Sequence, residues 1–267
     1  MKGLADVYAQ QFKTTFASFV QYRAAIFIWM IGHVLEPLVY LVVWSVVSQS
    51  TGGPVGGYAA RDFAAYFIVL MLVNHLTYTW VIYEFEYRVR EGSLSFALLR
   101  PLHPIHTDVV DNLSSKLITL PMMLGSAAAL ALVFRPAFRI VPWALAAFLP
   151  AILLAFAVRF LAEWTLALAA FWTTRTNAVN QAYYVAALFL SGQVAPLSLF
   201  PRPVQAVANL LPFRWMIGFP VELILGRLTP RQALVGFSAQ AAWLVLIVLA
   251  LRAVWRAGTK AYSAVGG

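Results

Sequence analysis

Residues 142–171 read PWALAAFLPAILLAFAVRFLAEWTLALAAF, and within this run only Arg159 and Glu163 carry a charge. A helix needs about 20 mainly apolar residues to cross the hydrocarbon core of a bilayer, which is about 30 Å thick. This stretch meets that length with residues to spare. It predicts a transmembrane helix, and therefore a chain whose main solvent is lipid.

The rest of the chain repeats this pattern. Only 11% of the residues are charged, 62% are hydrophobic and the mean hydropathy is +0.78, whereas soluble domains carry about 25% charged residues. We therefore predict an all-α membrane protein with six transmembrane helices in a single domain, residues 1–267. The other five predicted spans are 24–48, 63–87, 114–134, 178–200 and 233–255.

Residues 1–22 precede the first span and mix polar with aromatic positions. Val7, Phe12 and Phe16 recur near helical spacing, which predicts an amphipathic helix lying at the membrane interface. The alternative is a soluble start to the first helix.

Residues 201–231 contain two apolar pieces, 203–211 and 215–225, which are each too short to span. Pro212 and Pro220 interrupt them. Because proline removes a backbone hydrogen-bond donor and breaks helices, we predict a re-entrant helical hairpin on the extracellular side before the last span.

Basic residues predict the orientation, since cytoplasmic loops carry an excess of lysine and arginine. Arginines in the opposing loops weaken this bias without reversing it. An even number of spans places both termini in the cytoplasm, and the predicted location is the cell (inner) membrane. The basic residues of the two flanks are Lys2, Lys13, Arg23, Arg252, Arg256 and Lys260.

The cytoplasmic loop after the second span, residues 88–112, is the most informative segment. A short helix can form between Gly92 and Leu99, with Leu94, Ala97 and Leu98 as its apolar set. Such a helix suits either docking into a groove of a partner protein or lying on lipid.

The strings YRVREGSL (residues 87–94) and LLRPL (residues 98–102) resemble the first cytoplasmic loop of type-2 ABC transporter permeases. In that family the loop carries a coupling helix that docks into a separate ATPase subunit. The resemblance implies that coupling residues here are Arg90, Glu91, Gly92, Ser93, Leu94, Ala97, Leu98, Arg100 and Pro101.

The resemblance also implies a function: the membrane-spanning permease subunit of an ATP-driven ABC exporter, with a dimer forming the translocation pathway. The second permease chain would be an identical copy or a sister permease. The chain contains no phosphate-binding Gly-x-x-x-x-Gly-Lys-Ser/Thr motif. ATP and Mg are therefore expected on the ABC ATPase subunit, with no cofactor on this chain.

Charges inside predicted spans are costly and are functional candidates by default. Arg159 and Glu163 are four residues apart and can pair on one helical face, as a structural contact or as part of the pathway. His33 and Glu36 lie three residues apart, and the same two interpretations apply to them.

Glu222 lies in the predicted hairpin, where two interpretations also stay open. It either faces a vestibule or pairs with Arg214 or Arg227.

Other classes of function are poorly supported. The chain has no cysteine, no His-Glu-x-x-His motif and no basic run, so we expect no metal site, no catalytic residues and no nucleic-acid partner. The alternative function is an ion-coupled secondary transporter or channel, which would use His33, Glu36, Arg159 and Glu163 as a relay. Inverted repeats would favour that alternative, and the sequence shows none.

Overall fold

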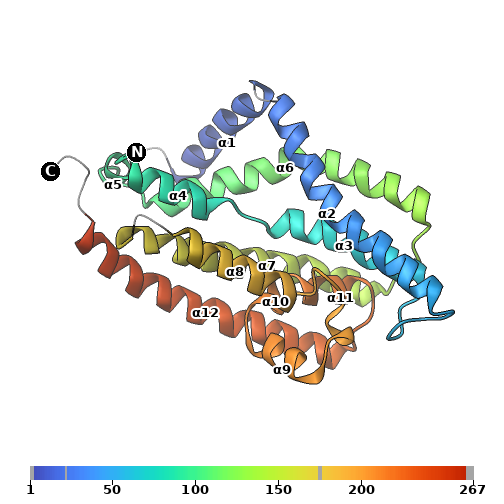
Figure 1. The fold of residues 1–267 in the computed structure, drawn as a ribbon. Coiled ribbons are helices and arrows are strands. Elements are labelled where there is room, and N and C mark those ends of the chain that lie inside the picture. The colour runs from blue at the N-terminus through green and yellow to red at the C-terminus, as the bar shows by residue number, and fades with distance from the viewer. Residues whose placement is uncertain (1–2, 22, 174–175, 263–267) are drawn as a thin grey trace.

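A computed structural model describes residues 3–21, 23–173 and 176–262. Within these residues the regular structure is helical, and the long helices form one elongated bundle (Figure 1). The α-helices are α1 (Leu4–Gln21), α2 (Arg23–Ser50), α3 (Ala60–Thr77), α4 (Val81–Arg90), α5 (Leu94–Leu98), α6 (Pro104–Phe134), α7 (Pro142–Ala167), α8 (Asn177–Leu190), α9 (Arg202–Leu210), α10 (Phe213–Met216), α11 (Gly218–Ile224) and α12 (Pro230–Ala261). Two short 3-10 turns, η1 (Leu168–Phe171) and η2 (Leu197–Leu199), complete the order.

Five helical segments of the described chain are long and apolar enough to cross a membrane, which confirms a multi-pass architecture. They correspond to α2, α3 with α4, α6, α7 with η1, and α12. The predicted span 178–200 differs, because its helix α8 has 14 residues and is only about 21 Å long at 1.5 Å per residue. The chain then turns at Gly192, whose φ of 92° lies in the left-handed region that favours glycine.

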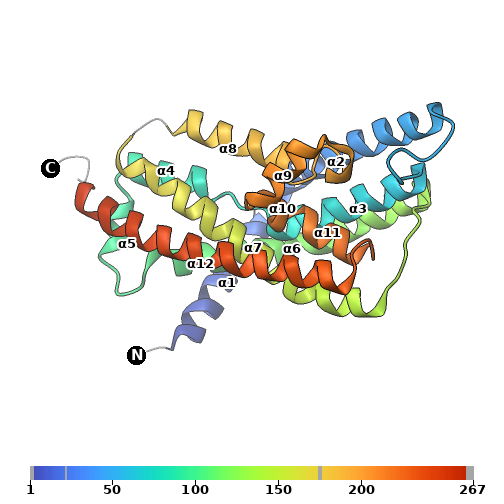
Figure 2. The same ribbon diagram turned by 90° about the horizontal axis from the view of Figure 1, so that it is seen from below.

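The second predicted span, 63–87, is also divided. Tyr78, Thr79 and Trp80 are not helical and separate α3 from α4. We call residues 78–80 the α3–α4 break. Figure 2 shows α3 and α4 following one another along the bundle with this short connection between them.

The two ends of the bundle differ in what they carry. Helix α5, the start of α1 and the end of α12 lie at one end, and the α2–α3 and α6–α7 connections lie at the other (Figures 1 and 2). Helices α9 to α11 lie beside the half of α12 that begins at Pro230.

Helix α1 packs along α6 through its polar side. Gln11 Nε2 and Thr15 Oγ1 donate to Asp111 Oδ1 at 2.8 and 2.6 Å. Val7 and Phe16, by contrast, are exposed, the latter by 50%. The helix is therefore amphipathic with its apolar side turned outward.

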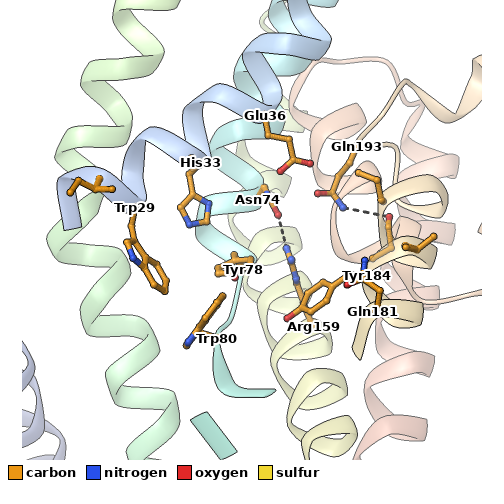
Figure 3. Close-up of a pocket in the computed structure, with 15 residues that line it drawn as sticks. Trp29, His33, Glu36, Asn74, Tyr78, Trp80, Arg159, Gln181, Tyr184 and Gln193 are labelled. Carbon is orange, nitrogen blue, oxygen red and sulfur yellow. Dashed lines mark hydrogen bonds between the residues drawn. The ribbon is translucent and has the colours of Figure 1, made fainter. Parts of the chain in front are cut away.

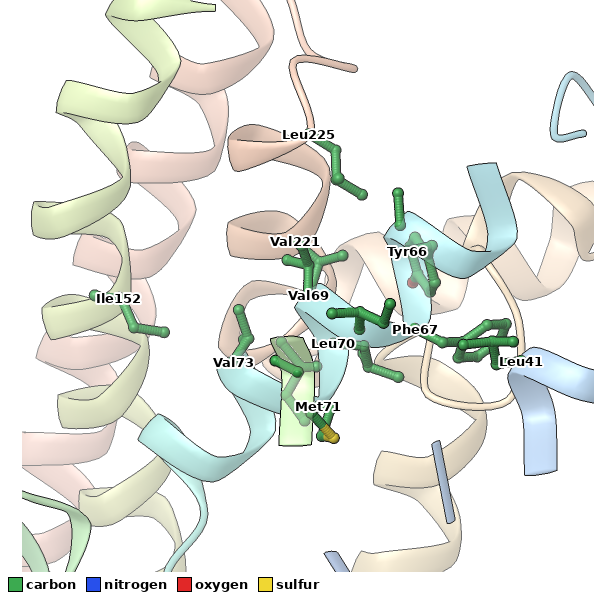
Figure 4. Packing of buried hydrophobic residues seen from close by; sticks show 14 of the residues in the cluster. Leu41, Tyr66, Phe67, Val69, Leu70, Met71, Val73, Ile152, Val221 and Leu225 are labelled. Atoms are coloured by element: carbon green, nitrogen blue, oxygen red, sulfur yellow. The ribbon is translucent and has the colours of Figure 1, made fainter. Parts of the chain in front are cut away.

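Helix α3 forms the centre of the fold. It is apolar on all sides, as expected of a helix surrounded by others, and it packs against α2, α6, α7 and α11. Figure 4 shows Phe67 and Leu70 of α3 with Leu41 of α2 and Val221 of α11 in this core.

Helix α11 is buried from Gly218 to Leu223. Gly236 of α12 permits its close approach, because a Cβ atom at that position would lie 2.1 Å from Cε2 of Phe219. Helix α11 is therefore packed inside the bundle, which is the condition under which irregular backbone survives at membrane depth, whereas α9 is mostly exposed.

Candidate functional site

The two ends of the predicted coupling loop are joined by an ion pair. Arg88, near the end of α4, donates through Nη1 to Oδ1 and through Nη2 to Oδ2 of Asp108 in α6, both at 2.9 Å. Bidentate pairs of this kind are geometrically specific. The pair fixes the base of the loop, and the sequence interpretation missed Asp108 although it lies within residues 88–112.

Asp108 also connects the loop to α7. Trp164 donates its indole Nε1–H to Asp108 Oδ2 at 2.8 Å, and both residues are buried. Trp164 packs against Phe85 of α4, with ring centroids 5.4 Å apart. A displacement of the loop therefore acts directly on α7.

His103 closes this cluster at the start of α6. Its Nδ1 accepts a hydrogen bond from Ile105 N at 3.3 Å, which caps the helix, and its ring lies 4.4 Å from that of Trp255. Burial lowers the pKa of His103 below its usual value of 6.5, and the nearby His106 acts in the same direction.

The predicted apolar set of α5 lies against the rest of its own chain. Leu94 has no exposed surface and packs with Val81, Ile82 and Phe85 of α4. Ala97 and Leu98 are partly buried against the same cluster. The predicted apolar set therefore anchors α5 to its own chain.

The outer face of α5 is apolar instead. Phe96 is 72% exposed and Leu99 is 83% exposed. The sequence interpretation omitted both, although they lie within the predicted helix. Their spacing of three residues, which places them on one helical face, was the available signal.

The polar residues of the predicted coupling set lie just before and just after α5 in the sequence. Ser93 does not cap α5, since its Oγ donates to Arg88 O at 3.4 Å. Gly92 has a φ of 71°, which permits the turn from α4 into α5. Arg90 Nε lies 3.7 Å from Glu91 Oε1, and the remaining exposed residues of the predicted set are Arg100 and Pro101.

At membrane depth, Arg159 and Glu163 form the predicted pair in α7. Arg159 Nε donates to Glu163 Oε1 at 2.9 Å, and both side chains are buried. Arg159 Nη1 also donates to Asn74 Oδ1 at 2.7 Å and Thr77 Oγ1 at 3.0 Å in α3. The i, i+4 spacing gave the pair, and the structure adds its partners in α3.

The pair is tied to the α3–α4 break. Thr79 Oγ1 donates to Glu163 Oε2, and Tyr183 of α8 donates to Glu163 Oε1 at 3.3 Å. Lys116 of α6 donates through Nζ to the carbonyl oxygen of Tyr78 at 2.5 Å. Lys116 therefore satisfies a backbone carbonyl that an unbroken helix would satisfy internally, and the Thr79 side chain ties the break to Glu163.

A cleft of about 530 Å³ lies between α2 and α8. We call it the α2–α8 cleft, and Figure 3 shows His33 and Glu36 on its α2 side with Arg159 and Asn74 at its base. The structure thus brings three of the predicted intramembrane residues to one cavity. Its other polar or aromatic lining residues are Trp29, Tyr78, Trp80, Gln181, Tyr184 and Gln193.

A second cavity of about 600 Å³ lies between α1, α2 and α6. Trp29, His33, Tyr78 and Trp80 line both cavities. The start of α2 and the α3–α4 break therefore separate the two.

Glu222, the fifth predicted intramembrane residue, lies elsewhere. Its Oε2 accepts from Arg214 Nη2 at 2.9 Å, whereas Arg227 pairs with Asp62 at 3.1 Å. Of the two predicted partners, Arg214 is the one it contacts. This ion pair joins α10 to α11.

The structure thus contains a loop that is bound to α6 and α7 through Asp108, and a cleft between the long apolar helices. Comparison with known proteins is consistent with a membrane transport protein. The family model described as ABC-2 family transporter protein matches residues 34–266. Searches of curated proteins and of solved structures give no match. The match covers α2 from residue 34, the loop 88–112 and the helices from α3 to α12, and the chain accordingly belongs to the ABC-2 transporter family as a membrane permease subunit.

Proposed function

We propose that the chain is the permease subunit of an ATP-driven ABC exporter, and that it couples to a separate ATPase subunit through α5. The observation that carries this proposal is the contact between the coupling loop and the bundle through Asp108, which binds Arg88 and Trp164 together. A partner that moves α5 would pull on α4 and α7 at the same time.

The docking surface in this proposal is the exposed apolar face of α5, formed by Phe96 and Leu99. Exposed apolar residues next to charged ones are typical of protein interaction sites. Arg90, Glu91 and Arg100 would form the charged rim. ATP and Mg would bind the partner, and this chain would contribute only the docking helix.

The α3–α4 break provides a place where motion can be absorbed. Because residues 78–80 are not helical, α4 can tilt without bending α3. Tyr78 and Trp80 line the α2–α8 cleft, so a tilt of α4 would change the cleft directly. We propose that this cleft is part of the translocation pathway and that a second permease chain closes its open side.

The same proposal includes the topology. Six crossings result if α8 with the turn after it counts as the fifth, with both termini and α5 on the cytoplasmic side of the cell membrane. Helix α1 would rest on lipid with Val7 and Phe16, which are exposed. Helices α9 to α11 would enter from the extracellular side as the re-entrant hairpin.

The surroundings of Glu163 do not favour the ion-coupled alternative. Glu163 accepts hydrogen bonds from Arg159, Thr79 and Tyr183 and has no exposed surface. A relay residue needs a partner from which it can exchange protons or ions with water. The pair therefore fits a structural role better.

Purification of the tagged chain from its native membranes tests the proposal. The double variant Phe96→Asp, Leu99→Asp should lose co-purification of an ATPase polypeptide, identified by its phosphate-binding loop and by ATP hydrolysis. The matched control is Phe138→Asp, Ile140→Asp, which makes the same change at two exposed positions at the opposite end of the bundle. Equal ATPase recovery with both double variants would contradict the proposal.

A further inference from the structure

Among the residues that line the α2–α8 cleft, Glu36 is acidic and Arg159 is basic, and the positive charge of Arg159 acts on Glu36. Arg159 at its base is matched by Glu163 at 2.9 Å. Glu36, on the α2 wall, has no hydrogen bond or ion pair with any other described residue, and its side chain is exposed to the cleft. A carboxylate without a partner at membrane depth is costly and marks a functional position.

The lining of the cleft leaves donors as well as acceptors without hydrogen bonds to the described residues, among them Nη2 of Arg159. Arg159 uses Nε and Nη1 for Glu163, Asn74 and Thr77. Gln193 uses its amide nitrogen for Ser191 Oγ at 3.0 Å, so its carbonyl oxygen is the end that is left to accept.

Tyr184 on the α8 wall adds a polar atom that needs a partner. Its hydroxyl is buried and makes no hydrogen bond to the described residues. Buried polar groups are normally paired, but this hydroxyl has no accessible surface, so a ligand in the cleft could reach it only if the α8 wall shifted.

Aromatic rings form the wall on the opposite side. Trp29 and Trp80 are in edge contact with centroids 4.9 Å apart, and Tyr78 lies 6.4 Å from Trp80. The faces of such rings attract cations. The rings and Glu36 therefore favour the same sign of charge in a ligand.

We propose that the α2–α8 cleft binds an amphipathic organic cation, with its aromatic or apolar body against Trp29 and Trp80 and its positive charge near Glu36. The volume of about 530 Å³ lies in the range of pockets that hold drug-sized molecules. This inference rests on the proposed function, because it assigns the class of cargo to the cleft of a transporter.

Two probes of the same shape and opposite charge test the sign. Tetraphenylphosphonium is a cation with four phenyl rings, and tetraphenylborate is its anionic counterpart. Equilibrium dialysis of each against the purified full-length chain in a neutral detergent measures binding without ATP or an ATPase. The variants are Glu36→Gln, Glu36→Asp and Trp29→Leu, and the matched control is Asp6→Asn, which removes an exposed carboxylate in α1.

We expect saturable binding of tetraphenylphosphonium that Glu36→Gln weakens about tenfold, because a contact between opposite charges in a partly wet site is lost. Trp29→Leu should weaken it about threefold through the lost ring contact. Glu36→Asp should keep most of the affinity, and Asp6→Asn all of it. Glu36→Gln should not weaken binding of tetraphenylborate.

Three results would overturn the inference: no saturable cation binding, unchanged cation binding in Glu36→Gln, or tighter binding of the anion by the wild-type chain. Should Glu36→Gln fail to fold, the preference of the wild-type chain between the cationic and the anionic probe still decides the sign of charge. Failure here with intact dependence of ATPase association on Phe96 and Leu99 would refute only the ligand class. Cation binding without any ATPase association would refute the permease proposal alone.

Discussion

Arg88 and Asp108 are bound to each other through two parallel contacts of 2.9 Å, across a loop that separates them by twenty positions in the sequence. Asp108 is 4% exposed and Arg88 is 22% exposed in their side chains. Because Trp164 shares the same carboxylate, the contact connects α4, α6 and α7. The contacts of Asp108 therefore hold the loop of residues 88–112 against the helix bundle.

Replacing either member of this pair should destabilise the chain. We expect Asp108→Ala and Arg88→Ala each to lower the free energy of unfolding by about 2–4 kcal/mol, because each leaves a partly buried charge unpaired. The double variant should lose less than the sum. Chemical unfolding in detergent measures this, and Glu91→Ala, which removes an exposed and loosely paired carboxylate, should change stability by less than about 0.5 kcal/mol. Additive losses would show that the pair does not contribute as a unit.

The buried pair in α7 makes a sharper comparison. We expect Arg159→Ala to lower the free energy of unfolding more than the double variant Arg159→Ala, Glu163→Ala, since the single change leaves Glu163 charged and fully buried. The single loss should be about 3–5 kcal/mol. Unfolding curves of the two variants decide the question, and a double variant less stable than the single one would be inconsistent with pairing.

The contact between α11 and α12 depends on the absence of a side chain at Gly236. Gly236→Ala would place Cβ within 2.1 Å of the Phe219 ring and should cost about 1–3 kcal/mol through overpacking. Gly125→Ala is the control, because a Cβ there meets nothing within 4 Å. Thermal unfolding should separate the two variants, and equal stabilities would mean that α11 is not held against α12.

The pKa of His103 predicts a pH dependence. Burial lowers this pKa from its usual 6.5, so the unfolded chain binds more protons than the folded chain between the lowered value and 6.5. Stability contributed by neutral His103 is therefore present above pH 6.5 and is lost as the pH falls below it. His103→Asn, which keeps a capping side chain, should flatten this part of the curve of unfolding free energy against pH. An unchanged curve would exclude His103 as the source.

The α3–α4 break shows where sequence reasoning stops. Residues 78–80 contain no glycine or proline, and the apolar run 63–87 around them gives no sign of interruption. The carbonyl oxygen of Tyr78 accepts a hydrogen bond from Lys116, and the side chain of Thr79 donates to Glu163. Lys116 lies 38 positions from Tyr78 in the sequence, so no local pattern could predict the break.

The sequence also could not show which face of α5 is buried in its own chain, for a related reason. An apolar set at Leu94, Ala97 and Leu98 suits docking onto a partner as well as burial in the same chain. In the folded chain Leu94 is buried against Phe85, whereas Phe96 and Leu99 are exposed to solvent. Periodicity gives the faces of a helix, but the neighbours of each face come from the tertiary structure.

The sequence by itself determined the apolar helices of a membrane protein, the pairing of Arg159 with Glu163, and the loop that carries the family resemblance. Within lipid each helix must satisfy its own backbone, so composition and local spacing are sufficient to locate it. The tertiary structure alone decided the early end of α8, the break between α3 and α4, and the convergence of Glu36, Arg159 and Tyr184 on one cleft. These features depend on contacts between residues that are distant in the chain, and their energies arise only when the helices pack together.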